Sequence, residues 1–135
     1  DVTYFGYGPI ESYPDKHHDA KLGLYTSDVD SLHEDYLRPQ ENGSHWNCSG
    51  LALTTSDHRS LLISGTQNFS FNASRYTQEE LTTKAHSFEL EKSPYTVLCL
   101  DGYMSGCGSN SCGPALAKKY RVDQDKLTFT FTLNF

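Results

Sequence analysis

The stretch Lys126-Leu-Thr-Phe-Thr-Phe-Thr-Leu133 alternates apolar and polar residues without a break. Its leucines and phenylalanines fall on one side of an extended chain, and its three threonines fall on the other. A period of two, built from β-branched and aromatic side chains, predicts a strand with one buried face. The preceding Asp123-Gln-Asp125 predicts a turn, and residues 119–122 are the expected hairpin partner of the strand.

Five further segments have the composition of short strands, each bounded by Gly, Pro, Ser or Asp: 3–7, 50–54, 61–63, 68–71 and 96–100. The helix signal is Thr77-Gln-Glu-Glu80, a capping-box pattern followed by Leu81 and Ala85 on one face. It predicts one short helix at 78–87, with Pro94 beyond its end. Many short strands with a single helix predict an all-β fold, an antiparallel β-sandwich.

Length and composition indicate a single domain spanning residues 1–135. Hydrophobic residues make up 36% of the chain, enough for one packed core without disulfides or a metal. The net charge of −6 disfavours nucleic acid and anionic lipid as partners. The sequence has neither an apolar run of the ~20 residues that span a bilayer nor the pattern of a signal peptide. Because Asp1 is not a natural initiator, we expect a processed chain or a piece of a longer protein.

The residue pattern predicts no catalytic centre and no metal site. The four cysteines have no spacing suited to zinc and are expected as separate reduced thiols of a cytoplasmic protein. His17 and His18 favour a solvated loop, because adjacent residues of a strand point to opposite sides. His45 and His86 are expected to pack or cap. Seven glutamates are available for acid–base chemistry, but no spacing singles out a catalytic pair.

The glycine-rich segment 101–114 is the least ordinary part of the sequence. Its Gly106-x-Gly108 pair lacks the helix start that a phosphate cradle requires. Ser109-Asn-Ser111-Cys-Gly113 has serine where a nucleophile elbow begins with glycine. A long loop of this kind is more typical of a docking or binding element on a rigid scaffold.

Four motifs occur together in an order and spacing that resemble one family. They are Gly6-Tyr-Gly-Pro-Ile-Glu-Ser-Tyr-Pro-Asp15, Tyr36-x-x-Pro-Gln-Glu-Asn-Gly43, Phe69-x-Phe-x-x-Ser-x-Tyr76 with Glu80-Leu81 and His86, and Leu100-Asp-Gly with Ser111-Cys-Gly-Pro114. From Thr3 to Leu133, the chain resembles the extreme C-terminal part of the large bacterial β-galactosidases of glycoside hydrolase family 2. In some species this part lies on a separate small subunit.

The resemblance implies a non-catalytic part of the C-terminal β-sandwich domain, a supersandwich related in fold to galactose mutarotases. The family's catalytic glutamates and its Mg²⁺ and Na⁺ ligands lie on a barrel domain outside this segment, so no cofactor is expected here. The implied partners are that barrel and the other domains of an enzyme that hydrolyses terminal β-D-galactosides, such as lactose, with retention. Alone, the segment is expected to be inactive. We also expect that its free strand edges pair with another copy, or that the segment keeps only part of the sandwich architecture.

The resemblance also implies a set of residues near the substrate. One loop of the family's C-terminal domain reaches the aglycone side of the active site and corresponds to 106–114, with Ser109, Asn110, Ser111 and Cys112 nearest the substrate. Well-known members present a tryptophan where this chain has Cys112. A thiol supplies no aromatic face, so we expect a weaker or differently shaped aglycone site.

Two other functions stay open at this point. Trp46 and the nine tyrosines could form a sugar-stacking platform, which would make the chain a free-standing carbohydrate-binding module. The third hypothesis, based on the cysteines and histidines, is a metal-binding or redox protein. Binding of oligosaccharides by the chain alone would favour the module, and bound zinc would favour the metal protein.

Overall fold

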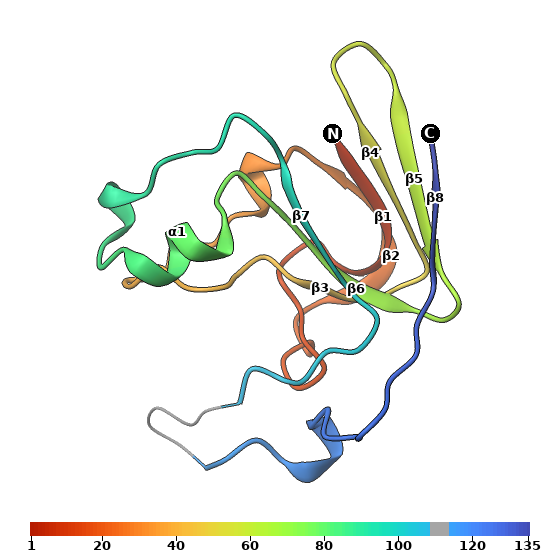
Figure 1. The fold of residues 1–135 in the computed structure, drawn as a ribbon, viewed down its shortest axis with the longest axis vertical. Helices are drawn as coiled ribbons and strands as arrows, with labels where there is room; N and C mark the ends of the chain where they lie inside the picture. Colours follow the sequence, from red (N-terminus) through yellow and green to blue (C-terminus); the bar gives the residue numbers. More distant parts are fainter. Residues whose placement is uncertain (109–113) are drawn as a thin grey trace.

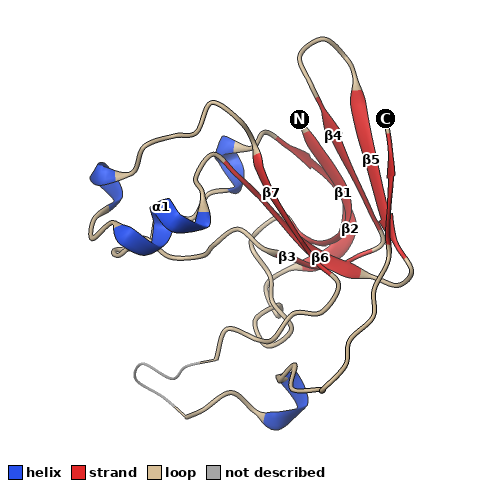
Figure 2. Ribbon diagram, viewed as in Figure 1, coloured by secondary structure: helices blue, strands red, loops and turns tan. Residues whose placement is uncertain are grey.

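The computed structural model describes residues 1–108 and 114–135, and it contains two antiparallel sheets (Figure 1). The larger sheet has the order β2-β1-β4-β5-β8, with strands at Lys21–Ser27, Val2–Gly8, Gly50–Thr54, Ser60–Gly65 and Phe131–Asn134. The smaller sheet has the order β3-β6-β7, with strands at His45–Cys48, Phe69–Ser74 and Val97–Asp101. Side chains of both sheets form one core. Strands dominate the described chain (Figure 2), so the predicted all-β sandwich is confirmed.

The core lies where the first strands of the larger sheet face the smaller sheet. The Tyr4 ring, 1% exposed, packs 5.1 Å from the Phe71 ring and 4.4 Å from the His45 ring, measured between centroids. Strand pairing places Leu51 beside Tyr4 and Ile63 beside Leu51, so these residues share one buried face. The buried members of the cluster are Val2, Tyr4, Leu32, Cys48, Leu51, Ile63, Phe69, Phe71 and Ala73.

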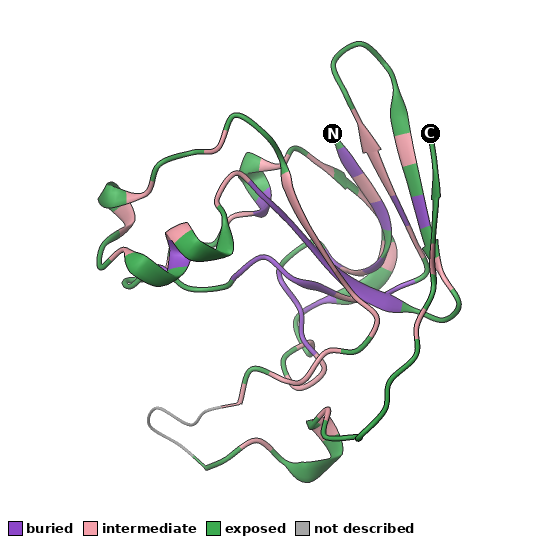
Figure 3. Ribbon diagram, viewed as in Figure 1, coloured by how far each residue is buried: buried purple, intermediate pink, exposed green. Residues whose placement is uncertain are grey.

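Strand β6 is buried along its whole length (Figure 3). Its apolar residues face the core, and strand alternation turns its polar residues to the other side of the sheet. There, the Asn72 side chain donates to the Asn42 carbonyl, and the Ser74 hydroxyl accepts from the Tyr76 amide at 3.0 Å. The outer face of β6 is therefore covered by chain, and the buried side chains of Asn72 and Ser74 have hydrogen-bond partners there.

The predicted helix begins where expected but is shorter. Helix α1 spans Gln78–Thr83, and the Thr77 hydroxyl accepts from the Glu80 amide at 3.0 Å. The Glu80 carboxylate accepts from the Glu91 amide at 2.9 Å instead of reaching back to Thr77. The predicted capping box is thus only half correct, although its N-terminal position is right.

A second capped turn explains the early end of α1. The Glu89 carboxylate accepts from the backbone amides of Ala85 and His86, at 3.0 and 2.8 Å, and starts a 3₁₀ helix at Ser87–Glu89. Ala85 therefore lies outside α1, and its predicted place on an apolar helix stripe is wrong. His86 lies at the N-cap of this 3₁₀ helix and not at the C-terminal end of α1, where it was expected. Another 3₁₀ turn, Asp30–Leu32, precedes the smaller sheet.

The predicted hairpin between 119–122 and the C-terminal strand is wrong. Lys118–Tyr120 forms a 3₁₀ helix, and β8 pairs with β5 instead. The Phe129 ring explains this choice, because it lies over two glycines: a Cβ at Gly65 or Gly102 would come within 2.7 or 2.3 Å of it. Phe129 and Phe131 contact the core, whereas the leucines of the same predicted face, Leu127 and Leu133, stay nearly half exposed.

Strands β2 and β3 were not predicted. Strand β2 is an edge strand whose leucines point away from the core, while Gly23, Tyr25 and Ser27 face inward, so its hydrophobic alternation does not mark the buried side. Register places Leu24 opposite Phe5, and Leu62 lies on the same outer face of the larger sheet. We call Phe5, Leu24 and Leu62, which are 44%, 70% and 52% exposed, the outer stripe. Within the described ranges, no helix has the length and apolar character needed to cross a membrane.

Candidate functional site

The four residues predicted nearest the substrate, Ser109, Asn110, Ser111 and Cys112, lie outside the described residues. The segments that lead into and out of them are described, and they are hydrogen-bonded to one another. The Ser105 hydroxyl accepts from the Val122 amide at 3.0 Å, and the Gly106 amide donates to the Tyr120 carbonyl at 3.2 Å. We call residues 105–108 the loop base.

A carboxylate from the N-terminal part of the chain also holds the loop base. Asp15 accepts from the amide of Cys107 at 2.8 Å and from the amide of Gly108 at 2.9 Å, one on each carboxylate oxygen. Gly106 lies so close that a Cβ there would be 2.3 Å from the Asp15 carboxyl carbon. The glycine is therefore needed for this approach.

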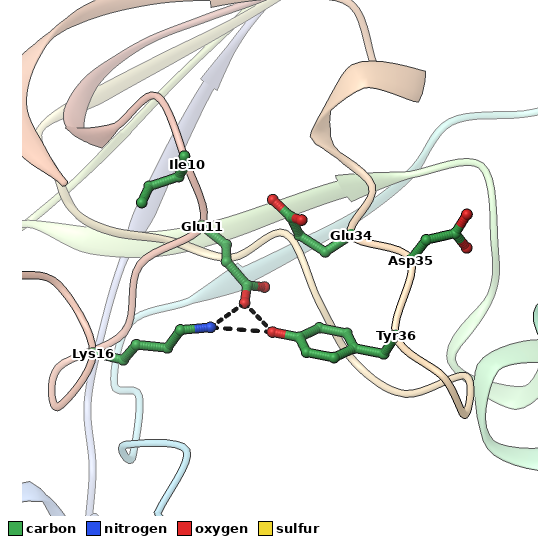
Figure 4. Close-up of a pocket in the computed structure, with 6 residues that line it drawn as sticks. All are labelled: Ile10, Glu11, Lys16, Glu34, Asp35 and Tyr36. Atoms are coloured by element: carbon green, nitrogen blue, oxygen red, sulfur yellow. Dashed lines mark hydrogen bonds and ion pairs between the residues drawn. The ribbon is translucent and has the colours of Figure 1, made fainter. Parts of the chain in front are cut away.

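Next to Asp15, a buried carboxylate is shared by three donors (Figure 4). One oxygen of Glu11 accepts from the Lys16 ammonium at 2.5 Å and from the Tyr36 hydroxyl. The other oxygen accepts from the Gly43 amide at 2.9 Å, and the Lys16 ammonium also donates to the Tyr36 oxygen at 3.1 Å. The Glu11 side chain is 5% exposed and that of Lys16 is 55% exposed. We call Glu11, Lys16 and Tyr36 the carboxylate triad.

The donors set the protonation state of this triad. Burial raises the pKa of Glu11, but the hydrogen bonds from Lys16, Tyr36 and Gly43 outweigh it and leave that pKa below its usual range. Burial lowers the pKa of Lys16, but the hydrogen bond to Glu11 reverses the effect and raises it. Burial and the bond to Glu11 raise the pKa of the Tyr36 hydroxyl. The triad is therefore a carboxylate, an ammonium and a neutral phenol at neutral pH.

The triad lines a cavity of about 300 Å³ together with Ile10, Glu34 and Asp35. Two glutamates thus border one cavity, the arrangement that a glycosidase uses. In Figure 4, however, the Glu11 carboxylate turns toward Lys16 and Tyr36, whereas that of Glu34 points elsewhere. A retaining glycosidase needs a free nucleophile and an acid with a raised pKa. Glu11 has both oxygens occupied and a lowered pKa, so it suits neither role.

Burial raises the pKa of Asp101, and the nearby charge of Glu41 adds to the increase. This carboxyl borders a cavity of about 60 Å³ that is also lined by Trp46, Asn47 and Asn68. That volume corresponds to about two water molecules in liquid water. The cavity is therefore too small for a sugar ring.

Trp46, the tryptophan of the possible sugar-stacking platform, packs against rings of the same chain. The Trp46 ring lies 5.1 Å from the Tyr7 ring and 4.4 Å from that of His17, which itself stacks on His18 at 5.2 Å. His17 and His18 thus face one another in a turn and do not point apart as residues of a strand would. Burial lowers the pKa of His45 to about 4, which agrees with its predicted packing role.

The residues that the structure describes contain no group of three or more His, Cys, Asp or Glu side chains placed to hold a metal ion. Cys48, Cys99 and Cys107 are free thiols.

Three of the four sequence motifs meet at this place. The first contributes Glu11 and Asp15, the second contributes Tyr36 and Gly43, and the last leads into the loop base. Sequence reasoning treated Glu11 only as one available glutamate and missed the contact of Asp15 with the loop base. The motifs themselves were the signal, because they mark the positions that come together.

Replacement of Glu11 by glutamine should lower the free energy of unfolding at pH 7 by about 1–3 kcal/mol, because the Lys16 ammonium loses its anion. Since folding lowers the pKa of Glu11, this stabilisation is present above the unfolded-state value of about 4.3 and lost as the pH falls through the folded-state value. Urea unfolding at pH 7 and near pH 3.5 should therefore show a difference between wild type and variant that shrinks in acid. The exposed Glu91→Gln is the control, and a pH-independent difference would contradict the assignment.

The fold and these contacts define a β-sandwich domain in which two carboxylates, Glu11 and Asp15, hold a turn and the loop base. Comparison with protein families agrees: residues 1–133 match the family described as the β-galactosidase small chain. The chain therefore belongs to that family.

Curated relatives extend the comparison. The chain is 52% identical to a β-galactosidase of Actinobacillus pleuropneumoniae, over 99% of this chain and 13% of that protein. It is 37% identical to a β-galactosidase of Staphylococcus xylosus, again over 99% of this chain and 13% of the relative. A β-galactosidase of Oenococcus oeni is 33% identical over 97% of this chain and 12% of its own length. The chain thus spans about an eighth of the length of these relatives.

Proposed function

We propose that residues 1–135 form the C-terminal part of the C-terminal β-sandwich domain of a retaining β-galactosidase of glycoside hydrolase family 2. In this proposal the domain is non-catalytic. It supports the catalytic barrel and contributes a loop to the aglycone side of the site where terminal β-D-galactosides, such as lactose, are hydrolysed.

The observation that carries the proposal is the coverage of the relatives. Nearly all of this chain matches β-galactosidases, yet it accounts for about an eighth of their length. The remaining seven-eighths provide ample room for a barrel, which takes roughly 250 residues. A domain of this size is suited to a supporting role.

The chemistry of the described carboxylates supports the same conclusion. Retaining hydrolysis uses two carboxyl groups roughly 5 Å apart, one as nucleophile and one as acid. Glu11 is occupied by three donors, and the Asp101 cavity is too small for a sugar. In the proposal, the catalytic glutamates and the Mg²⁺ and Na⁺ ligands therefore belong to the barrel.

The aglycone loop is the proposed contact with substrate, through Ser109, Asn110, Ser111 and Cys112. The loop base that leads into it is held by the Asp15 carboxylate and by the Val122 amide, as expected for a rim element on a rigid scaffold. Cys112 offers a small thiol where an aromatic ring would stack on a sugar. We therefore expect the aglycone site of this enzyme to bind the glucose side of lactose more weakly or to have a different shape.

The proposed partners are the barrel and the other domains of the same enzyme, in the bacterial cytoplasm. The outer stripe supports this part of the proposal, because exposed apolar side chains gathered on one sheet face favour contact with another surface. When excised, the same surface and the free edges of the sheets favour self-association.

The isolated 135-residue chain should show no turnover of a chromogenic β-galactoside, whereas the intact enzyme carrying the same chain should hydrolyse it. The reason is that the proposal assigns both catalytic carboxylates to the barrel. The measurement is release of the chromophore at matched molar concentrations. Turnover by the purified short chain would overturn the non-catalytic role, and an inactive intact protein would overturn the β-galactosidase assignment.

Calorimetry separates this proposal from the free-standing carbohydrate-binding module. A module should bind galactosides or oligosaccharides by itself, whereas a rim domain should give almost no heat. The packing of Trp46 against Tyr7 and His17 favours the rim domain.

A further inference from the structure

The loop base is attached to the protein through both oxygens of one carboxylate. The Oδ1 atom of Asp15 accepts from the Cys107 amide at 2.8 Å, and Oδ2 accepts from the Gly108 amide at 2.9 Å. Two consecutive amides bound to one anion fix both the position and the direction of the backbone. Gly108 has a φ of 66°, so the chain also turns at this point.

The other side of the contact is equally constrained. The carboxylate of Asp15 occupies the space where Gly106 would carry a side chain, with all three carboxyl atoms within 2.6 Å of the ideal Cβ position. The Gly106 amide is meanwhile tied to the Tyr120 carbonyl at 3.2 Å. The loop base therefore cannot shift toward Asp15, and the bond to the Tyr120 carbonyl opposes a shift away from it.

Asp15 itself stands on a rigid turn. The backbones of Tyr13 and Lys16 exchange hydrogen bonds of 2.8 and 3.0 Å, and Tyr13 is 5% exposed. The Lys16 side chain is bound within the carboxylate triad, which is fixed in turn by the Gly43 amide. A continuous set of bonds thus connects the core-side segment at Gly43 to the loop base.

We propose that Asp15 is a positioning residue, which holds Cys107 and Gly108 so that the chain enters the aglycone loop from one fixed point. This inference rests on the proposed function, because it takes residues 109–112 to meet the leaving-group side of the substrate. Asp15 does not touch the substrate. It acts through the loop base, and its removal changes how the enzyme treats the leaving group.

The test is Asp15→Asn in the intact β-galactosidase that carries this chain. An asparagine has one acceptor oxygen, and its amide N–H₂ cannot accept the second backbone N–H. One of the two bonds is therefore lost, and hydrogen exchange at Cys107 and Gly108 should become roughly tenfold faster. Asp19→Asn makes the same change at an exposed position in the same region and should leave exchange at these amides unaltered.

Kinetics separate positioning from a loss of general stability. With Asp15→Asn, the KM for lactose should rise roughly fivefold to tenfold, consistent with the loss of one hydrogen bond. The kcat/KM for β-galactosyl fluoride, whose leaving group is a single atom, should stay within about twofold of the wild type. Gly106→Ala places a methyl group against the Asp15 carboxylate and so disrupts the same contact. It should reproduce both kinetic results.

Each outcome decides a different point. Unchanged hydrogen exchange at Cys107 and Gly108 would overturn the anchor itself. Faster exchange with parallel losses for lactose and the fluoride, or with no kinetic change, would overturn the positioning role and leave the proposed function intact. If the wild-type enzyme hydrolysed neither galactoside, the proposed function would be wrong. The hydrogen-exchange data would still test whether Asp15 binds the amides of Cys107 and Gly108.

Discussion

Phe71→Ala is expected to lower the free energy of unfolding by about 3–5 kcal/mol. The Phe71 side chain is 0% exposed, and its ring packs 5.1 Å from that of Tyr4 and 5.2 Å from that of His45. Strand pairing places it between His45 and Leu100 in the middle of the smaller sheet. Because β6 is enclosed on both faces, its neighbours cannot collapse into the vacated space, and a cavity remains.

Urea unfolding followed by circular dichroism measures this loss, and Phe88→Ala is the matched control. Phe88 is 85% exposed and stacks only on the His86 ring among the described aromatic contacts, so its truncation should change stability by less than about 0.5 kcal/mol. Equal effects of the two substitutions would contradict the placement of the core.

Gly43→Ala is the second substitution with a large expected effect, a loss of roughly 3 kcal/mol or more. Gly43 has a φ of 68°, in the left-handed region that an alanine adopts only at a cost of about 1–2 kcal/mol. Its Cβ would lie 2.3 Å from the backbone oxygen of Leu32, which cannot rotate away. The shift needed to relieve this clash also pulls the Gly43 amide from Glu11, a bond of 2.9 Å.

Gly50→Ala is the control for the general effect of a glycine-to-alanine substitution on the free energy of unfolding. Nothing lies within 4 Å of a Cβ at Gly50, in strand β4, and its φ is outside the left-handed region. Stability should therefore stay unchanged or rise by up to about 1 kcal/mol, because the unfolded chain loses freedom. A destabilisation by Gly50→Ala that matches that of Gly43→Ala would show that the clash with Leu32 is not the cause.

The fold was largely predictable from local patterns. Strand β4 coincides with the predicted 50–54, and four other predicted strands differ from the observed ones by one to three residues at each end. The predicted strand at 126–133 is observed only from Phe131 onward, as β8. These segments alternate and are bounded by turn residues, so each carries its own signal. Strand β2 was not predicted because its leucines face outward. The predicted 119–122 hairpin is wrong because the pairing of β8 depends on the Phe129 ring, which lies over two distant glycines.

The site was predictable only as a set of motifs. The Tyr36 hydroxyl reaches Glu11 across 25 positions, and Asp15 reaches Cys107 across 92, so neither contact has a local pattern. The resemblance marked these positions without saying how they meet. The predicted substrate-side residues, 109–112, fall outside the described part of the chain and remain a prediction.

The separation of Asp15 from Cys107 along the chain has a consequence for variants far from either residue. Closing so long a segment costs conformational entropy, which the strand pairings offset only when both sheets are assembled. The loop base is therefore bound to Asp15 only in molecules in which the whole sandwich is folded. A variant that opens the sandwich more often raises the fraction of molecules in which the loop base is detached. Remote changes in the core thus alter the average behaviour of the loop without touching it.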